Sequence, residues 1–205
     1  MSEKEIKDEE KETEEIEFSN NNMENTDFSD RAVSSVFEWG NTLIAALIIV
    51  VLLMTFVFRQ VTVDGVSMEN TLQDGDRLIT TEVFYTPHNG DIVVISNGKK
   101  YLKPIIKRVI ATSGQTLSID YENNEVIVDG VLLEESYIKG RTIRPSREPL
   151  EIPSVIPDGY VFVMGDNREN SLDSRSAVID LIPVEDIMGK AVLRLYPFDS
   201  IGILS

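Results

Sequence analysis

The sequence predicts a mainly β chain, with an antiparallel β domain behind one long apolar helix. Residues 39–58 form a run of 20 residues without a charged side chain, and the run ends at Arg59. From residue 60 onward, short runs rich in β-branched residues alternate with turn sequences that contain Gly, Asn and Asp. This pattern is typical of a barrel-like or sandwich fold with few helices.

The first 30 residues carry most of the net charge. They contain twelve acidic and three basic residues, a net charge of −9, whereas the whole chain of 205 residues carries −16. A segment with so few large apolar residues cannot bury enough surface to offset its ordering entropy, so we expect residues 1–30 to be a disordered acidic tail. An acidic chain repels phosphate backbones, which argues against a nucleic-acid partner.

The apolar run predicts a single membrane-spanning helix. At about 1.5 Å per residue, it measures about 30 Å, the thickness of a bilayer core. The alternative is a buried core helix, but such helices seldom run this long without a polar face. A cleavable signal peptide fits less well, because the run is long, lies far from the N-terminus and lacks a small-residue cleavage site. Residues 31–59 are thus the predicted anchor in the lipid bilayer, and Arg31 and Arg59 at its two ends leave its orientation open.

Eight short runs in the rest of the chain predict β-strands. Turn sequences separate them, and Asp129-Gly130 at the centre of residues 125–133 predicts a tight hairpin. Residues 134–156 contain three prolines and few strand-forming residues, so we expect a long surface excursion there. The predicted strands cover residues 61–63, 77–81, 91–96, 105–110, 116–119, 125–128, 160–164 and 191–196.

Composition narrows the chemistry that the chain can perform. It has no cysteine, which excludes disulfides, thiolate nucleophiles and cysteine-based zinc sites. Its single histidine, His88, lies in a turn sequence and is expected to be a polar surface residue. A Ser-His-Asp triad therefore has only one weak candidate base, and a serine nucleophile would need a lysine instead. We predict no metal site and no cofactor.

Ser67 is a candidate nucleophile. It follows Gly65, where a predicted strand ends, and glycine permits a sharp backbone turn there. A nucleophile just past such a turn leaves its backbone N–H free to face a substrate carbonyl. The alternative is a serine that only hydrogen-bonds within the turn.

Lys107 is a candidate general base. It stands beside Arg108 in an apolar strand, and because side chains alternate, it shares one face with Ile105 and Val109. Burial of the amine lowers the pKa of a lysine toward neutrality, which makes it a usable base. The alternative is an edge strand that leaves both cations in solvent.

A dense polar segment, residues 165–175, follows the predicted strand 160–164. Its side chains suit hydrogen bonds to backbone groups, and Asp173 and Arg175 suit a supporting ion pair. The alternative is a solvated loop.

In order along the chain, these segments resemble the conserved boxes of bacterial type I signal peptidases. The resemblance covers about residue 39 to the C-terminus, and its last stretch is long and specific. Asn70 departs from the pattern, since these enzymes usually have a proline there, and the change bears on the rigidity of the turn rather than on the reaction. The matching stretches are Ser67-Met68 with Thr71-Leu72, residues 90–94, Lys107-Arg108-Val109 and residues 165–175.

The resemblance implies a signal-peptidase-like fold and a membrane-bound serine endopeptidase. Such an enzyme removes signal peptides from exported preproteins after small residues at positions −3 and −1. By this likeness Ser67 is the nucleophile, Lys107 is the general base, and the reaction passes through an acyl-enzyme. The supporting positions are a lysine-orienting serine, an ion pair and a structural arginine, here Ser171, Asp173 with Arg175, and Arg108.

The same likeness implies how a preprotein binds and where the enzyme works. The Ser67 N–H belongs to the oxyanion hole, and the substrate strand pairs along residues 61–64. The acidic tail lies in the cytoplasm and residues 60–205 lie outside the cell membrane, a single-span arrangement like that of Gram-positive relatives. Core packing is the alternative for each expected substrate-binding position. Those positions are Val61, Val63, Gly65, Met68, Leu72, Val94 and Ile106.

Two other functions stay open at this stage. Another Ser/Lys protease of the LexA-like type would be soluble and carry a DNA-binding module, which the apolar run and the acidic tail do not match. An inactive homologue would be a tethered β domain that only binds partners. Such a homologue would be free to lose Ser67, Lys107 and Ser171, and all three are present.

Overall fold

The computed structural model describes residues 39–52, 58–81, 85–96, 103–146 and 148–204. They belong to two compact units, one ending at Leu53 and one beginning at Met54. The first unit contains a helix over residues 39–52 with exposed side chains throughout. Within the described ranges, no helix reaches the length and apolar character that a membrane crossing requires. The predicted span 39–58 includes residues 53–57, which lie outside the described residues together with the tail 1–30, so the anchor stays a prediction.

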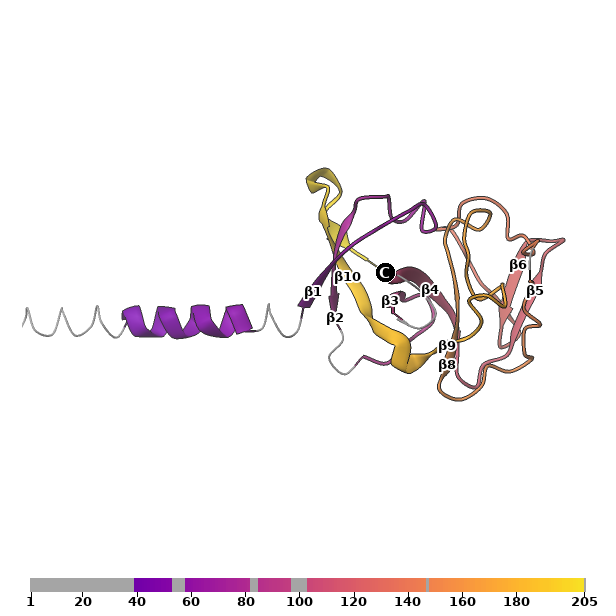
Figure 1. Cartoon of the computed structure of the whole chain (residues 1–205), viewed down its shortest axis with the longest axis horizontal. Coiled ribbons are helices and arrows are strands. Elements are labelled where there is room, and N and C mark those ends of the chain that lie inside the picture. Colours follow the sequence, from indigo (N-terminus) through magenta and orange to yellow (C-terminus); the bar gives the residue numbers. More distant parts are fainter. Residues whose placement is uncertain (1–38, 53–57, 82–84, 97–102, 147, 205) are drawn as a thin grey trace, which may run out of the picture. The chain divides into compact units, whose positions relative to one another are not determined.

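The second unit is mainly β, as predicted (Figure 1). Each predicted run overlaps a strand, and the first strand begins at Phe58, two residues before the expected start of the domain. Its elements are β1 (Phe58–Thr62), β2 (Arg77–Thr81), β3 (Ile92–Ile95), β4 (Ile105–Thr112), β5 (Leu117–Asp120), β6 (Glu125–Val128), β7 (Val131–Leu132), β8 (Tyr160–Met164), β9 (Ile182–Pro183), η1 (Val184–Asp186), β10 (Ile187–Tyr196), η2 (Phe198–Ser200) and β11 (Gly202–Ile203).

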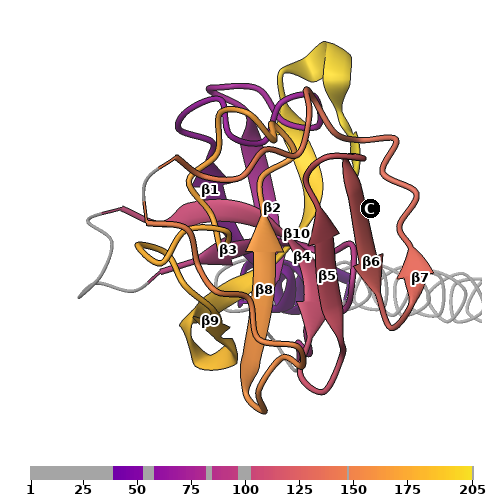
Figure 2. The ribbon, with the colours of Figure 1, turned by 90° about the vertical axis from the view of Figure 1, so that its right-hand side faces the viewer.

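The strands form two antiparallel sheets. The larger has the order β1-β2-β10-β3-β4-β8-β9, with β11 added to β10, and the smaller has the order β5-β6-β7. Figure 2 shows the smaller sheet beside β8. The long strand β10 pairs with β2 and with β3 along different parts of its length, and bulges interrupt both registers. Such bulges bend a strand, which lets the large sheet curl around its core.

The hairpin expected at Asp129-Gly130 is present between β6 and β7. Asp129 and Gly130 have φ values of 52° and 77°. Both residues thus take the positive φ that a two-residue hairpin turn with the native strand twist requires.

Strand β4 is the central element for the site. It pairs with β3 from Ile105 to Arg108, but its pairing with β8 begins only at Arg108. Among the described residues, 105–107 therefore have no strand partner on the side of β8. Beneath them lies a buried apolar cluster that contains Val94 and Ile106 of the sheet.

Candidate active site

The chain after β1 turns sharply to present Ser67. Val63 still pairs with the backbone of Asp76 across a 2.8 Å hydrogen bond, so the chain is extended up to this point. Gly65 then adopts a φ of +102°, and its N–H donates to Asp74 Oδ1 at 2.7 Å. The positive φ explains the glycine, since other residues are strained in this conformation.

Lys107 of β4 meets the Ser67 side chain at this turn. A 2.7 Å hydrogen bond joins Lys107 Nζ to Ser67 Oγ, and Nζ also donates to the Ile106 carbonyl at 2.9 Å. The lysine is only 3% exposed. The structure thus brings together the two residues that the sequence singled out as nucleophile and base.

Burial also changes the charge of this lysine. Removal from water lowers the pKa of Lys107 from 10.5 to about 8, with a further lowering by Arg175, while the carboxylates of Asp173 and Asp166 oppose the shift. With a pKa of about 8, about a quarter of the molecules carry a neutral amine at pH 7.5, against about one in a thousand for an ordinary lysine. A neutral amine next to a hydroxyl can accept its proton.

The loop after β8 holds the Ser67 turn by its backbone. The Asn167 N–H donates to the Ser67 carbonyl at 3.0 Å, and Asn167 Nδ2 donates to the Val66 carbonyl at 3.0 Å. Gly165 permits this approach, because a methyl group in its place would lie 2.5 Å from the Ser67 carbonyl oxygen and 2.2 Å from Ser171 Oγ. Residues 165–167 therefore fix the position of Ser67.

Ser171 lies next to Gly165, where the loop after β8 meets the Ser67 turn, but it makes no hydrogen bond to Lys107. Its Oγ is buried and has no hydrogen-bond partner among the described residues. Its lysine-orienting role therefore stays a prediction that rests on the resemblance.

Asp173 and Arg175 form the expected ion pair. Arg175 Nε and Nη2 each donate to one Asp173 oxygen at 2.8 Å, and the Gly165 N–H donates to the same carboxylate at 2.9 Å. Burial alone would raise the pKa of the Asp173 carboxyl, but the Arg175 guanidinium and the Gly165 N–H outweigh it, so this pKa lies below its ordinary value. The aspartate therefore stays ionised in the interior.

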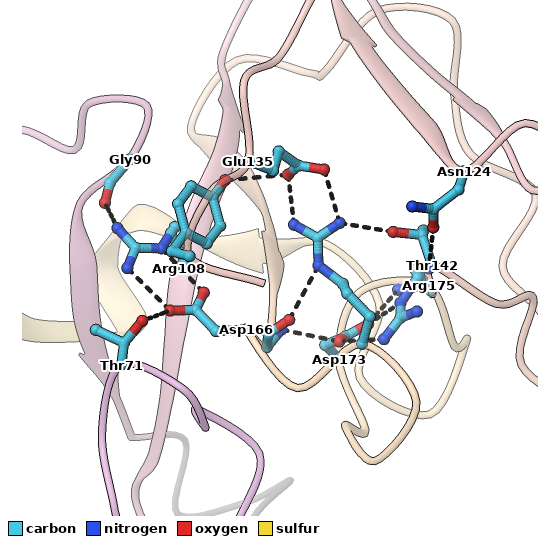
Figure 3. Close-up of polar contacts among 12 residues, drawn as sticks. Thr71, Gly90, Arg108, Asn124, Glu135, Thr142, Asp166, Asp173 and Arg175 are labelled. Atoms are coloured by element: carbon cyan, nitrogen blue, oxygen red, sulfur yellow. Dashed lines mark hydrogen bonds and ion pairs between the residues drawn. The ribbon is translucent and has the colours of Figure 1, made fainter. Parts of the chain in front are cut away.

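A second buried ion pair ties β4 to the same loop (Figure 3). Arg108 Nε and Nη2 donate to the two Asp166 oxygens at 2.9 Å each, and Arg108 Nη1 donates to the Gly90 carbonyl at 2.6 Å. The Thr71 hydroxyl also donates to Asp166. The guanidinium lies 4.1 Å from the centre of the Tyr137 ring, within the range of a cation–π contact. Arg108 thus joins β4 to the loop after β8, and its supporting role in the site stays a prediction.

The sequence did not single out Asp166, Arg168 or Glu135. Arg168 is buried and pairs with Glu135, while its Nε donates to the Gly165 carbonyl at 3.1 Å. Glu135 lies in the segment 134–156, expected to be a surface excursion, yet this part of it reaches the interior. The polar run 166–169 contains Asp166 and Arg168, but nothing in the sequence indicates which acid pairs with which base.

A small cleft runs beside Ser67 and Lys107. Three of the predicted substrate-binding residues, Val63, Met68 and Ile106, line it. Leu72 and Val94 are 0% exposed, so they support the cleft from the core. Its lining consists of Thr62, Val63, Asp64, Ser67, Met68, Pro104, Ile105, Ile106 and Lys107.

The two remaining predicted positions lie outside that lining. Val61 packs, half-buried, against the core cluster below, and Gly65 forms the turn before Ser67. Substrate contact at all seven positions stays a prediction.

Other candidate chemistry is not evident in the described ranges. No group of three His, Cys, Asp or Glu side chains there is placed to hold a metal ion. The His88 side chain is 76% exposed, as expected for a surface turn.

Replacement of Gly165 tests the close approach of the two loops. We expect Gly165→Ala to lower the free energy of unfolding by about 1–3 kcal/mol, because the added methyl overlaps backbone and side-chain atoms. Urea unfolding of the full chain in detergent measures this. Gly202→Ala is the control, since nothing lies within 4 Å of its added methyl. Equal stability of the two variants would contradict the packing described here.

The sequence and the fold were compared with known proteins. A model of the family "Signal peptidase, peptidase S26" matches residues 36–196. "Signal peptidase I P" of Bacillus subtilis subsp. natto is 36% identical over 183 residues, which cover 85% of this chain and 97% of the relative. "Probable signal peptidase I-1" of Synechocystis sp. is 39% identical over 173 residues, which cover 79% of this chain and 83% of the relative.

A crystal structure of a signal peptidase I from Enterococcus faecalis matches with a TM-score of 0.43 and 23% identity, over 53% of this chain and 98% of its own. The family model spans more than half of the chain, and the two relatives match nearly all of their own length. The chain therefore belongs to the signal peptidase family, peptidase S26, as a serine peptidase of the signal peptidase I type.

Proposed function

We propose that this chain removes signal peptides from preproteins through a Ser67/Lys107 dyad. The observation that carries the proposal is the 2.7 Å hydrogen bond between Lys107 Nζ and Ser67 Oγ, at an amine that burial has made easier to deprotonate. A buried amine that contacts a hydroxyl is the arrangement that general-base activation of a serine requires.

In the first half of the reaction, Ser67 Oγ attacks the carbonyl carbon of the scissile peptide bond, and neutral Lys107 takes the hydroxyl proton. The resulting ammonium then gives a proton to the departing nitrogen of the mature chain, and the signal peptide remains as an ester on Ser67. In the second half, Lys107 deprotonates a water molecule that attacks this ester. The lysine returns the proton to Ser67 Oγ as the signal peptide leaves.

In the transition state, negative charge develops on the oxygen of the scissile carbonyl, and hydrogen-bond donors must stabilise it. The Ser67 N–H is available for this, since it makes no hydrogen bond among those of the described residues. Gly65, two residues before Ser67, has no side-chain hydroxyl to donate to this oxygen. Backbone N–H groups, with water, therefore complete the oxyanion hole. The hydrogen bonds from Asn167 to the two carbonyls of this turn keep the donor in place.

The cleft favours small residues before the cut. Val63, Met68 and Ile106 are each less than 10% exposed and form shallow apolar walls next to Ser67. Such walls admit alanine and exclude bulky side chains. This is consistent with the small residues that precede signal-peptide cleavage sites.

The proposal includes a membrane location. The uncharged run 39–58 would anchor the chain once, with residues 1–30 in the cytoplasm and the β domain outside the membrane. This places the dyad on the side where signal peptides emerge. An inactive binding module is the weaker alternative, because such a module has no need of a serine hydroxyl and a lysine amine in contact beside a cleft, and the chain keeps both.

Loss of either dyad member should abolish cleavage. We expect Ser67→Ala and Lys107→Ala each to reduce kcat/KM for a preprotein in detergent by at least about 1,000-fold. Lys107→Arg should not restore activity, because arginine stays protonated. Ser118→Ala, at an exposed serine of the smaller sheet, is the matched control and should cleave normally. Retention of activity in either alanine variant would refute the dyad.

The dyad also predicts how activity depends on pH. Lys107 acts as a base only when neutral, so kcat/KM should rise with pH and level off above an apparent pKa of about 8. The slope of log kcat/KM against pH should be about one below that value. Initial rates on a synthetic preprotein peptide between pH 5 and pH 10 measure the profile. A flat profile over this range is incompatible with a lysine base.

A further inference from the structure

Two strand edges border the cleft. Strand β1 is the first strand in the order of the large sheet and pairs with β2. Within the described ranges, residues 105–107 of β4 pair with β3 and not with β8. One wall of the cleft continues from β1 through Val63 and Asp64, and the other runs from Pro104 to Lys107. An extended peptide can add to such edges through backbone hydrogen bonds.

One ion pair joins these two walls. Lys103 Nζ lies 2.7 Å from Asp64 Oδ2. Asp64 belongs to the cleft lining, and Lys103 immediately precedes Pro104 of the opposite wall. The pair lowers the pKa of Asp64 and raises that of Lys103, so both are charged at neutral pH.

This ion pair differs from the buried pairs that brace the site. The side chains of Lys103 and Asp64 are 78% and 69% exposed, whereas those of Arg108 and Asp166 are 3% and 1% exposed. An exposed pair is weak and is screened by salt, so it contributes little to the fold and opens readily. The position of this pair across the cleft therefore matters more than its contribution to stability.

We propose that Asp64 and Lys103 form a clasp over the substrate cleft, which a signal-peptide strand must open before it can bind. The inference rests on the proposed function and names two residues that control access to the same site. Opening the clasp costs part of the binding free energy of the substrate and leaves the dyad unchanged. The clasp therefore raises KM and has no effect on kcat.

The clasp predicts a pattern that independent substrate contacts would not give. Asp64→Asn, Lys103→Gln and the double variant all remove the same ion pair. Each should lower KM by about two- to fivefold, the range expected for one exposed pair, with kcat and the pH profile unchanged. Added salt should lower the KM of the wild type and leave that of the double variant nearly constant.

These constants are to be measured with the full chain in detergent on a synthetic preprotein peptide. Asp158→Asn is the matched control, since this exposed aspartate lies at the turn before β8 and makes the same change in net charge. Additive effects of the two single substitutions, a raised KM, or an equal fall in KM for Asp158→Asn would each overturn the clasp. A wild-type enzyme that does not cleave the peptide would instead contradict the proposed function.

A reversible crosslink provides a second test. The chain has no cysteine, so Asp64→Cys/Lys103→Cys introduces the only two thiols. Bridging them with a short bis-methanethiosulfonate reagent should abolish cleavage, and dithiothreitol should restore it. The single-cysteine variants treated with the same reagent are the controls. Full activity of the bridged enzyme would show that the substrate does not pass between these residues.

Discussion

The structure depends on one buried amine. Lys107 is almost fully enclosed, yet its Nζ contacts Ser67 Oγ and the Ile106 carbonyl. A buried ammonium ion is costly, so its surroundings favour the neutral form, and the pKa falls to about 8. Lys107 lies where β4 pairs with β3, and the Ser67 turn, which the loop after β8 holds in place, lies against its amine. A fold built around β4 thus gives an ordinary lysine the properties of a base.

Three buried ion pairs lie near the buried amine, and each joins one arginine to one carboxylate. Arg108 pairs with Asp166, Arg175 with Asp173, and Arg168 with Glu135, and all three arginines are at most 3% exposed in their side chains. Buried pairs add little net stability, but loss of one partner is strongly destabilising. The first pair ties the loop after β8 to β4, and the third ties this loop to the segment 134–156. The second pair lies within the loop and braces it internally. The loop then holds Ser67 in front of the lysine through Gly165 and Asn167.

Much of the fold, and the meeting of Ser67 with Lys107, could be predicted from the sequence, for physical reasons. Strand periodicity and turn residues such as Asp129-Gly130 act locally, so they indicate strands without knowledge of the partners. The apolar neighbours of Lys107 indicated its burial. By contrast, the pairing of Arg168 with Glu135 joins residues from distant segments, and no local pattern encodes it. The same limit applies to Leu72 and Val94, because the sequence does not distinguish an apolar residue of the core from one that lines a pocket.

The most direct test is to titrate the Lys107 amine itself. Side-chain NMR of the full chain in detergent, with ¹⁵N-labelled lysine and Lys107→Arg for assignment, reports its protonation as a function of pH. We predict a midpoint of about 8 for Lys107, against about 10.4 for exposed lysines. A midpoint of Lys107 near that of the exposed lysines would contradict the account, because the amine would then be protonated whenever the enzyme works.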